Sequence, residues 1–136
     1  MRIGVTEIAV DDQERARDFY TRVLGLRLKA DAPYGSGARW LTVVSPEDPY
    51  GTELLLGPLD EAAAGLQAAR REQGTPAISF VTSNCRRSYE ELRKRGAVFR
   101  SAPQKRSYGG IDAVLEDGCG NLLNLHESGG LTAIEA

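Results

Sequence analysis

The chain contains an internal repeat with an offset of about 72 residues. Asp12 and Asn84 each precede a segment whose apolar residues recur at helical spacing, and these two helix-capping positions are 72 residues apart. The strand-like segments 53–56 and 124–127 align at an offset of 71 residues. Because nearly the same offset fits both ends, the two halves are predicted to be copies of one structural unit. Such a repeat constrains the fold more strongly than local propensity does.

Each copy is predicted to contain one strand, one helix and three further strands. Apolar and polar residues alternate through 3–10, and helical spacing then runs through 13–24 until Gly25. The other predicted strands are 26–31, 39–45, 52–56, 77–82, 98–100, 111–115 and 122–127, and the second helix is 85–95. The glycines within 117–121 predict a hairpin turn. The sequence therefore predicts an α+β fold.

Residues 59–75 separate the two copies. They are rich in Ala, Glu, Gln and Arg, a composition that favours a surface helix or a partly ordered connector. We therefore expect a single domain made of module one (1–58), this connector and module two (76–127). The tail, 128–136, is expected to be mobile because chain ends become ordered only when they are tied down.

The composition excludes several classes of partner. Seventeen Lys and Arg residues stand against 19 Asp and Glu residues, and no cluster of five basic residues occurs, so nucleic acid is not an expected partner. No apolar run approaches the roughly 18 residues of a membrane span, and the N-terminus has no secretory features. We expect a cytoplasmic protein without a membrane partner, in which Cys85 and Cys119 stay reduced.

Six short segments carry a resemblance to a known family. They are 10–12 (Val-Asp-Asp), 19–25 (Phe-Tyr-Thr-Arg-Val-Leu-Gly), 39–40 (Arg-Trp), 53–55, 92–96 and 117–121. In this order and at this spacing they resemble the vicinal oxygen chelate superfamily, which includes glyoxalases, bleomycin-resistance proteins and extradiol dioxygenases. The resemblance covers almost the whole chain. It implies two βαβββ modules that form a cup-shaped mixed sheet with the helices outside, and chains that pair as homodimers. Whether the modules that face each other belong to one chain or to two stays open.

The resemblance also implies where a metal would be bound. Metalloenzymes of this family hold a divalent ion with one side chain from the first and last strand of each module, and the matching residues here are Val5, Glu53, Ala77 and Asn124. Only Glu53 is a competent ligand, because valine and alanine have no donor atom and a neutral amide binds a hard cation weakly. We therefore expect no metal and no other cofactor.

A displaced metal site is the alternative. Glu7 lies on the same predicted strand face as Val5, and His126 on the same face as Asn124, so Glu7, Glu53 and His126 are a possible shifted set of ligands. A shift of two residues moves a side chain by roughly 6.6 Å along its strand, so these three groups need not converge.

Eight side chains are expected to contact a ligand in the cup. Trp40 shares a strand face with Thr42, and an aromatic lining suits a planar organic ligand, although the same position suits ordinary core packing. His126 is the only histidine; it is either solvent-exposed or a polar contact in the cup, paired with Glu7 or Glu53. The expected ligand-binding residues are Glu7, Trp40, Thr42, Glu53, Ser79, Tyr108, Asn124 and His126.

The function that these features favour is metal-independent binding of a small organic molecule, aromatic or drug-like. Like bleomycin-resistance proteins, a homodimer would enclose its ligand in metal-free clefts and lower the ligand's free concentration by mass action. One alternative is an enzyme: a glyoxalase-like lyase or isomerase, or a dioxygenase, that uses Glu53 or His126 with or without a divalent metal. Another is a protein-interaction module with a collapsed cup.

Overall fold

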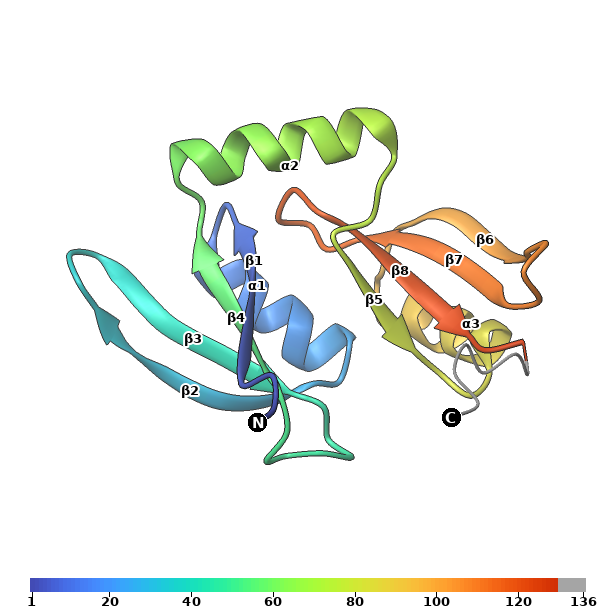
Figure 1. The fold of residues 1–136 in the computed structure, drawn as a ribbon, viewed down its shortest axis with the longest axis horizontal. Helices are drawn as coiled ribbons and strands as arrows, with labels where there is room; N and C mark the ends of the chain where they lie inside the picture. Colours follow the sequence, from blue (N-terminus) through green and yellow to red (C-terminus); the bar gives the residue numbers. More distant parts are fainter. Residues whose placement is uncertain (130–136) are drawn as a thin grey trace.

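Two four-stranded mixed sheets, one from each half of the chain, make up the structure (Figure 1). The computed structural model describes residues 1–129. Module one contains β1 (Val5–Val10), α1 (Gln13–Asp18), the π-helix η1 (Phe19–Val23), β2 (Arg27–Tyr34), β3 (Ala38–Val44) and β4 (Glu53–Pro58). Helix α2 (Glu61–Gln73) follows. Module two contains β5 (Ile78–Val81), α3 (Cys85–Lys94), β6 (Phe99–Lys105), β7 (Ile111–Glu116) and β8 (Leu122–Glu127).

The two sheets have the same topology. Their strand orders are β1-β4-β3-β2 and β5-β8-β7-β6, and in each sheet the first strand pairs in parallel with the last. The other strand pairs are antiparallel. The predicted repeat and the α+β fold class are therefore confirmed.

The two predicted helix caps are present. The side chain of Asp12 accepts a hydrogen bond from the backbone N–H of Arg15 at 2.9 Å, and Asn84 accepts one from Arg87 at 3.0 Å. The predicted helix over 13–24 widens into a π-helix from Phe19, where the N–H of Leu24 donates to the carbonyl of Phe19. A π turn of this kind changes which side chains face inward, and here Tyr20 is completely buried.

Three predicted boundaries differ from the structure. The connector is a continuous helix, α2, which ends at Gly74 with a φ of 70°. Strands β2 and β6 extend further than predicted, through Pro33 and Pro103. Proline is tolerated there because both strands are at the outer edge of their sheets, where a missing N–H breaks no ladder. Most of the predicted mobile tail, residues 130–136, lies outside the described residues.

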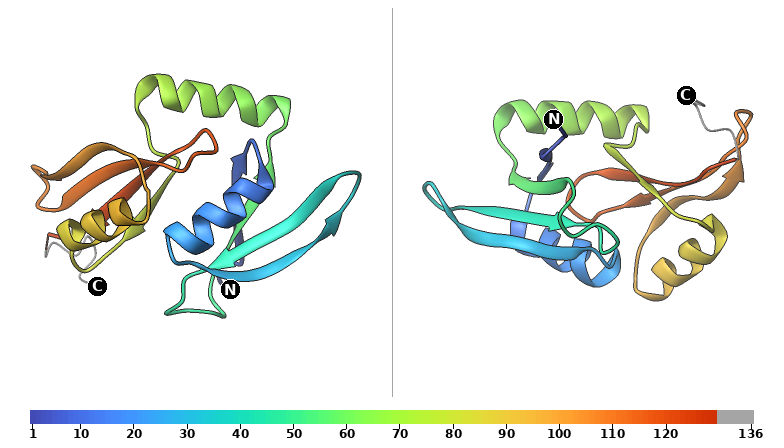
Figure 2. Two further views of the ribbon diagram at one scale, coloured as in Figure 1. Left: turned by 180° about the vertical axis from the view of Figure 1, so that it is seen from behind. Right: turned by 60° about the horizontal axis from the view of Figure 1, so that its bottom comes forward.

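Helices α1 and α3 cover the same side of the two sheets, and α2 lies across one end of both modules (Figure 2). The covered side forms one core that contains residues of both modules, including Ile8, Leu56, Leu115 and Leu123. Cys85 and Cys119 are free thiols buried in it, and burial raises the pKa of both. None of the helices within residues 1–129 has the length and apolar character needed to cross a membrane.

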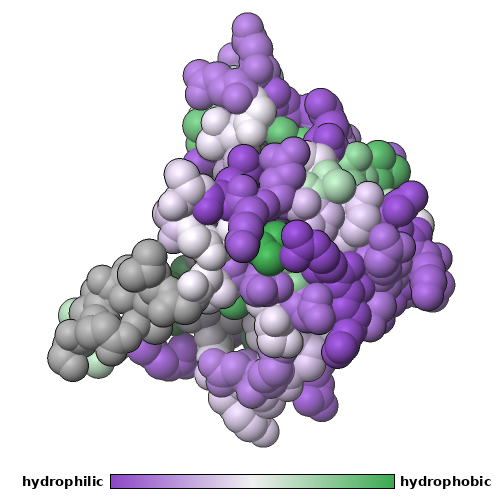
Figure 3. Space-filling model, turned by 90° about the vertical axis from the view of Figure 1, so that its right-hand side faces the viewer, coloured by the Kyte–Doolittle hydropathy of each residue, from purple (hydrophilic) through white to green (hydrophobic). Residues whose placement is uncertain are grey.

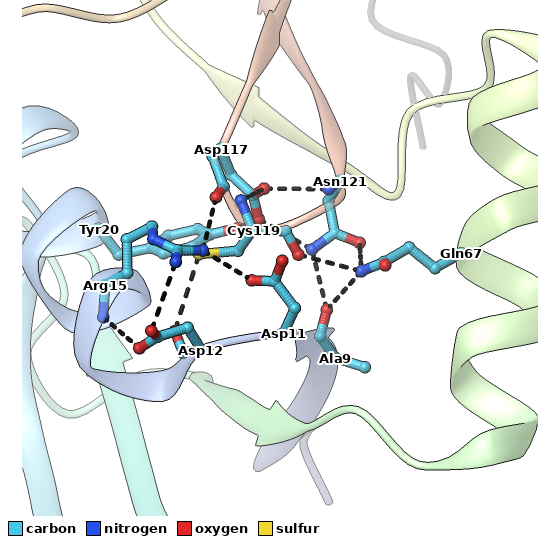
Figure 4. A network of polar contacts seen from close by, with 10 residues as sticks. Ala9, Asp11, Asp12, Arg15, Tyr20, Gln67, Asp117, Cys119 and Asn121 are labelled. Carbon is cyan, nitrogen blue, oxygen red and sulfur yellow. Dashed lines mark hydrogen bonds and ion pairs between the residues drawn. The ribbon is translucent and has the colours of Figure 1, made fainter.

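A buried carboxylate joins the modules (Figure 4). Asp117, in the turn between β7 and β8, accepts a hydrogen bond from the Tyr20 hydroxyl at 2.7 Å and two from the backbone N–H groups of Cys119 and Asn121. The Asn121 amide donates to Asp117 and to the carbonyl of Ala9 in β1. From α2, Gln67 donates to the same carbonyl. One network therefore connects a strand, the π-helix, α2 and the predicted 117–121 turn.

We expect Tyr20→Phe to lower the free energy of unfolding by about 1.5–3 kcal/mol, because it leaves one position of the buried Asp117 carboxylate without its donor. Tyr50→Phe, at a side chain that is 82% exposed, is the matched control and should change stability by less than about 0.5 kcal/mol. Urea unfolding measures both. Equal free energies of unfolding for the two variants would contradict the conclusion that the hydrogen bonds of Asp117 connect the two modules.

Candidate functional site

The faces of the two sheets that α1 and α3 leave uncovered carry the predicted ligand-binding residues. In the first sheet, Val5 pairs with Glu53 and Thr42 pairs with Leu55, which places Glu53 and Thr42 on one face. In the second sheet, Ser79 and Asn124 pair, and Asp112 pairs with His126. Apart from Glu7, which lies beneath α2, the site residues therefore form one group on each sheet.

The group on the first sheet consists of two neighbouring pairs. The hydroxyl of Thr42, which is completely buried, donates to Oε1 of Glu53 at 2.8 Å. Two residues along β3, the ring of Trp40 lies 5.6 Å from the ring of Tyr34, measured between centroids. This sheet therefore presents the Glu53 carboxylate, hydrogen-bonded by Thr42, and an aromatic surface formed by two rings.

The group on the second sheet is centred on Asp112, which is not among the predicted ligand-binding residues. Its carboxylate lies 2.6 Å from Nδ1 of His126 and 3.5 Å from the Asn124 amide nitrogen, and it accepts a hydrogen bond from the Tyr108 hydroxyl. Asn124 also donates to Ser79 at 3.0 Å. One sequence signal could have found Asp112: it is an acidic residue within the apolar strand segment 111–115, on the face that carries His126.

The environment of Asp112 favours its ionised form. Burial alone would raise the pKa of this carboxyl group, but the hydrogen bonds from Tyr108, His126 and Asn124 outweigh burial and hold the pKa below its usual range. Its hydrogen bond to Asp112 raises the pKa of the Tyr108 hydroxyl. The centre of this group is therefore an anion that only accepts hydrogen bonds.

The alternative metal ligands do not converge within one chain. His126 pairs with Asp112, and not with Glu7 or Glu53, the partners considered in the alternative to a solvent-exposed histidine. The Glu7 carboxylate lies over Gly57, where a methyl group would collide with it, and lines a cavity of about 210 Å³ beneath α2. Across residues 1–129, no three His, Cys, Asp or Glu side chains are grouped closely enough to hold a metal ion.

The positions that match the family's ligands also do not fit a divalent ion. Val5 and Ala77 have no donor atom, and the amide nitrogen of Asn124 is directed at Ser79 and Asp112 as a hydrogen-bond donor. Glu53 remains, and a single carboxylate does not compete with water for such an ion.

Two cavities lie between the modules. One of about 600 Å³ is bordered by 24–26, 45–47, β5 and α3, and of the predicted ligand-binding residues only Ser79 lines it. A smaller cavity of about 170 Å³ is lined by both Glu53 and Ser79. Neither these two cavities, nor the one beneath α2, nor one of about 200 Å³ beside β2 is lined by Trp40, Tyr108 or His126. Their sheet faces are open in one chain.

The open faces end at strands with exposed apolar residues. Strands β1 and β5 each form one edge of their sheet, opposite β2 and β6, and they carry Val5 and Val81, whose exposed fractions are 45% and 76%. The face seen from the side of module two is mainly hydrophilic, with hydrophobic areas that are small and separate (Figure 3). Val5 and Val81 are therefore exposed apolar residues on strand edges that have no partner strand within residues 1–129.

Comparison with known proteins agrees with the fold. The family model described as the Glyoxalase/Bleomycin resistance protein/Dioxygenase superfamily matches residues 2–125. Among curated proteins, the uncharacterized protein YurT of Bacillus subtilis (strain 168) is 42% identical over 126 residues, which cover 92% of this chain and 98% of YurT.

Two solved structures are similar over almost their whole length. UcmS2 has a TM-score of 0.79 at 31% identity and covers 94% of this chain and 98% of its own. TnmS3, described as an antibiotic binding protein from Streptomyces sp. CB03234, has a TM-score of 0.74 at 25% identity, with coverages of 93% and 95%.

The ionised state of Asp112 predicts a pH dependence of stability. Because folding lowers its pKa, Asp112 stabilises the fold above the unfolded-state pKa of about 3.9, and this contribution is lost as the pH falls through the lower folded-state value. We expect the stability difference between the wild type and Asp112→Asn to shrink between about pH 5 and pH 2. Thermal unfolding measures it, with Asp18→Asn, an exposed carboxylate, as the control. A constant difference would contradict an ionised Asp112.

Proposed function

Because the chain belongs to the Glyoxalase/Bleomycin resistance protein/Dioxygenase superfamily, we propose that it is a non-catalytic protein that binds a small planar organic molecule without a metal. The observation that carries this proposal is the replacement of metal-binding donors by Val5, Ala77 and a hydrogen-bonded Asn124. Trp40 and Tyr34 supply the aromatic surface that such a ligand needs. The structural similarity to TnmS3, an antibiotic binding protein, supports a drug-like ligand.

The proposed cleft lies between two copies of the chain. In one copy the face with Trp40 and the face with His126 are both open, so neither buries the ligand surface that a tight complex requires. A homodimer in which module one of one copy faces module two of the other would enclose both faces. It would also cover Val5 and Val81 at the strand edges. We expect this dimer to act in the cytoplasm, where tight binding lowers the free concentration of a toxic compound.

Trp40 gives a direct test of ligand binding because it is the only tryptophan. Titration with a panel of planar polycyclic antibiotics should quench its fluorescence, and calorimetry should give the same dissociation constant. Trp40→Ala should weaken binding by about 10- to 100-fold, as is typical when a buried aromatic contact is removed. Trp40→Phe, the control, should retain most of the affinity. If no compound in the panel binds to the wild type, the proposed ligand class is wrong.

Val81→Glu tests the dimer. A carboxylate on the β5 edge should prevent close approach of a second copy, so sedimentation should show dimers for the wild type and monomers for this variant. Ligand affinity should fall by more than about tenfold, because half of the cleft is then missing. Val98→Glu is the control, since Val98 is 63% exposed but lies outside the edge strands β1 and β5. A monomeric Val81→Glu with unchanged affinity would contradict a cleft between copies.

An enzyme is the second candidate, favoured by one observation. A histidine held by a carboxylate, as His126 is by Asp112, is an arrangement that also serves proton transfer. Mass spectrometry of a bound compound after long incubation separates the two functions. Conversion that stops in His126→Gln would favour the enzyme, and recovery of the unchanged compound supports the binding protein.

A further inference from the structure

The hydrogen bond to Asp112 determines which nitrogen of His126 carries the hydrogen atom. Nδ1 lies 2.6 Å from the Asp112 carboxylate, and an ionised carboxylate can only accept. Nδ1 must therefore be the donor. In the neutral imidazole, Nε2 is then the nitrogen without hydrogen, and it acts as an acceptor.

The carboxylate that orients His126 is itself fixed from several sides. The Tyr108 hydroxyl donates to one of its oxygens, and Arg106 lies 3.6 Å from that oxygen. The Asn124 amide nitrogen lies 3.5 Å from the oxygen that binds His126. Asp112 is 6% exposed, so these contacts are largely shielded from water. The orientation of the imidazole is thus set before any ligand arrives.

Packing around the ring limits its movement. A methyl group added at Gly110 would lie 2.7 Å from Cε1 of His126, so the backbone of this loop lies close against the ring. The His126 side chain is still 27% exposed, and within residues 1–129 no group forms a hydrogen bond with Nε2. This nitrogen is a positioned acceptor without a partner in the described chain.

We propose that Nε2 of His126 accepts a hydrogen bond from a phenolic or enolic hydroxyl group of the ligand. This inference rests on the proposed function and specifies the chemical class of its ligand. The polar groups of the two sheet faces are centred on the carboxylates of Glu53 and Asp112, which repel anions and favour ligands that donate hydrogen bonds. A weakly acidic hydroxyl suits this position best, because Asp112 stabilises the positive charge that His126 gains as the proton is shared.

The first test needs no ligand. His126 is the only histidine, so long-range ¹H–¹⁵N spectra of the uniformly labelled protein, recorded at a pH at which the ring is neutral, show one imidazole whose two nitrogen shifts report its tautomer. We expect the form with hydrogen on Nδ1 in the wild type, and a mixture of both forms in Asp112→Asn. A wild-type ring with hydrogen on Nε2 overturns this proposal and leaves the binding function untouched.

The second test compares two probes that differ in one hydrogen-bond donor, 2-naphthol and 2-methoxynaphthalene. Calorimetry should show that the wild type binds 2-naphthol about three- to tenfold more tightly, the worth of one hydrogen bond. The His126→Phe variant should lose this preference, so that the two probes bind to it with similar affinity. Binding of 2-naphthol should also shift the Nε2 signal.

The outcomes separate the two proposals. Equal affinity of the wild type for both probes overturns recognition of the hydroxyl group, while small-molecule binding stands. A preference that persists in His126→Phe also overturns it, because another group must then accept the hydrogen bond. If neither probe binds at millimolar concentration, planar aromatic binding itself is contradicted, and recognition of the hydroxyl group falls with it.

Discussion

The arrangement of the two modules depends on the buried hydrogen bonds of Asp117. A carboxylate without contact with water must be fully satisfied, and here donors from both modules satisfy it: Tyr20 from module one, and the 117–121 turn from module two. The donors are placed correctly only when the turn lies against the π-helix. The requirement to satisfy the Asp117 carboxylate therefore helps to set how the two sheets of one chain lie relative to each other.

The same hydrogen-bond requirement explains the site. At positions where the family places metal ligands, the polar side chains of this chain bind one another: Thr42 donates to Glu53, and Asn124 donates to Ser79. These contacts keep polar atoms satisfied on sheet faces that would otherwise need an ion or water. The loss of metal ligands is thus accompanied by local pairs that hold the remaining groups in place.

Much of the fold could be predicted because its signals are local. The caps at Asp12 and Asn84, and the glycines of the 117–121 turn, show their chemistry within a few residues of sequence. Asp112 could not be assigned in the same way, since its partners Tyr108 and His126 meet it only after the β6–β7 loop folds back and β7 pairs with β8. Strand β2 was predicted too short because the effect of Pro33 depends on whether the strand is at a sheet edge, which sequence alone does not show.

The two modules share one topology, but the uncovered faces of their sheets carry different side chains. The first sheet presents the Trp40 and Tyr34 rings, whereas the second presents the imidazole held by Asp112. A cleft bounded by one of each is polarised across its width. A ligand with one apolar edge and one hydroxylated edge would then bind in a single orientation. The difference between the two repeats would therefore select the orientation of the ligand.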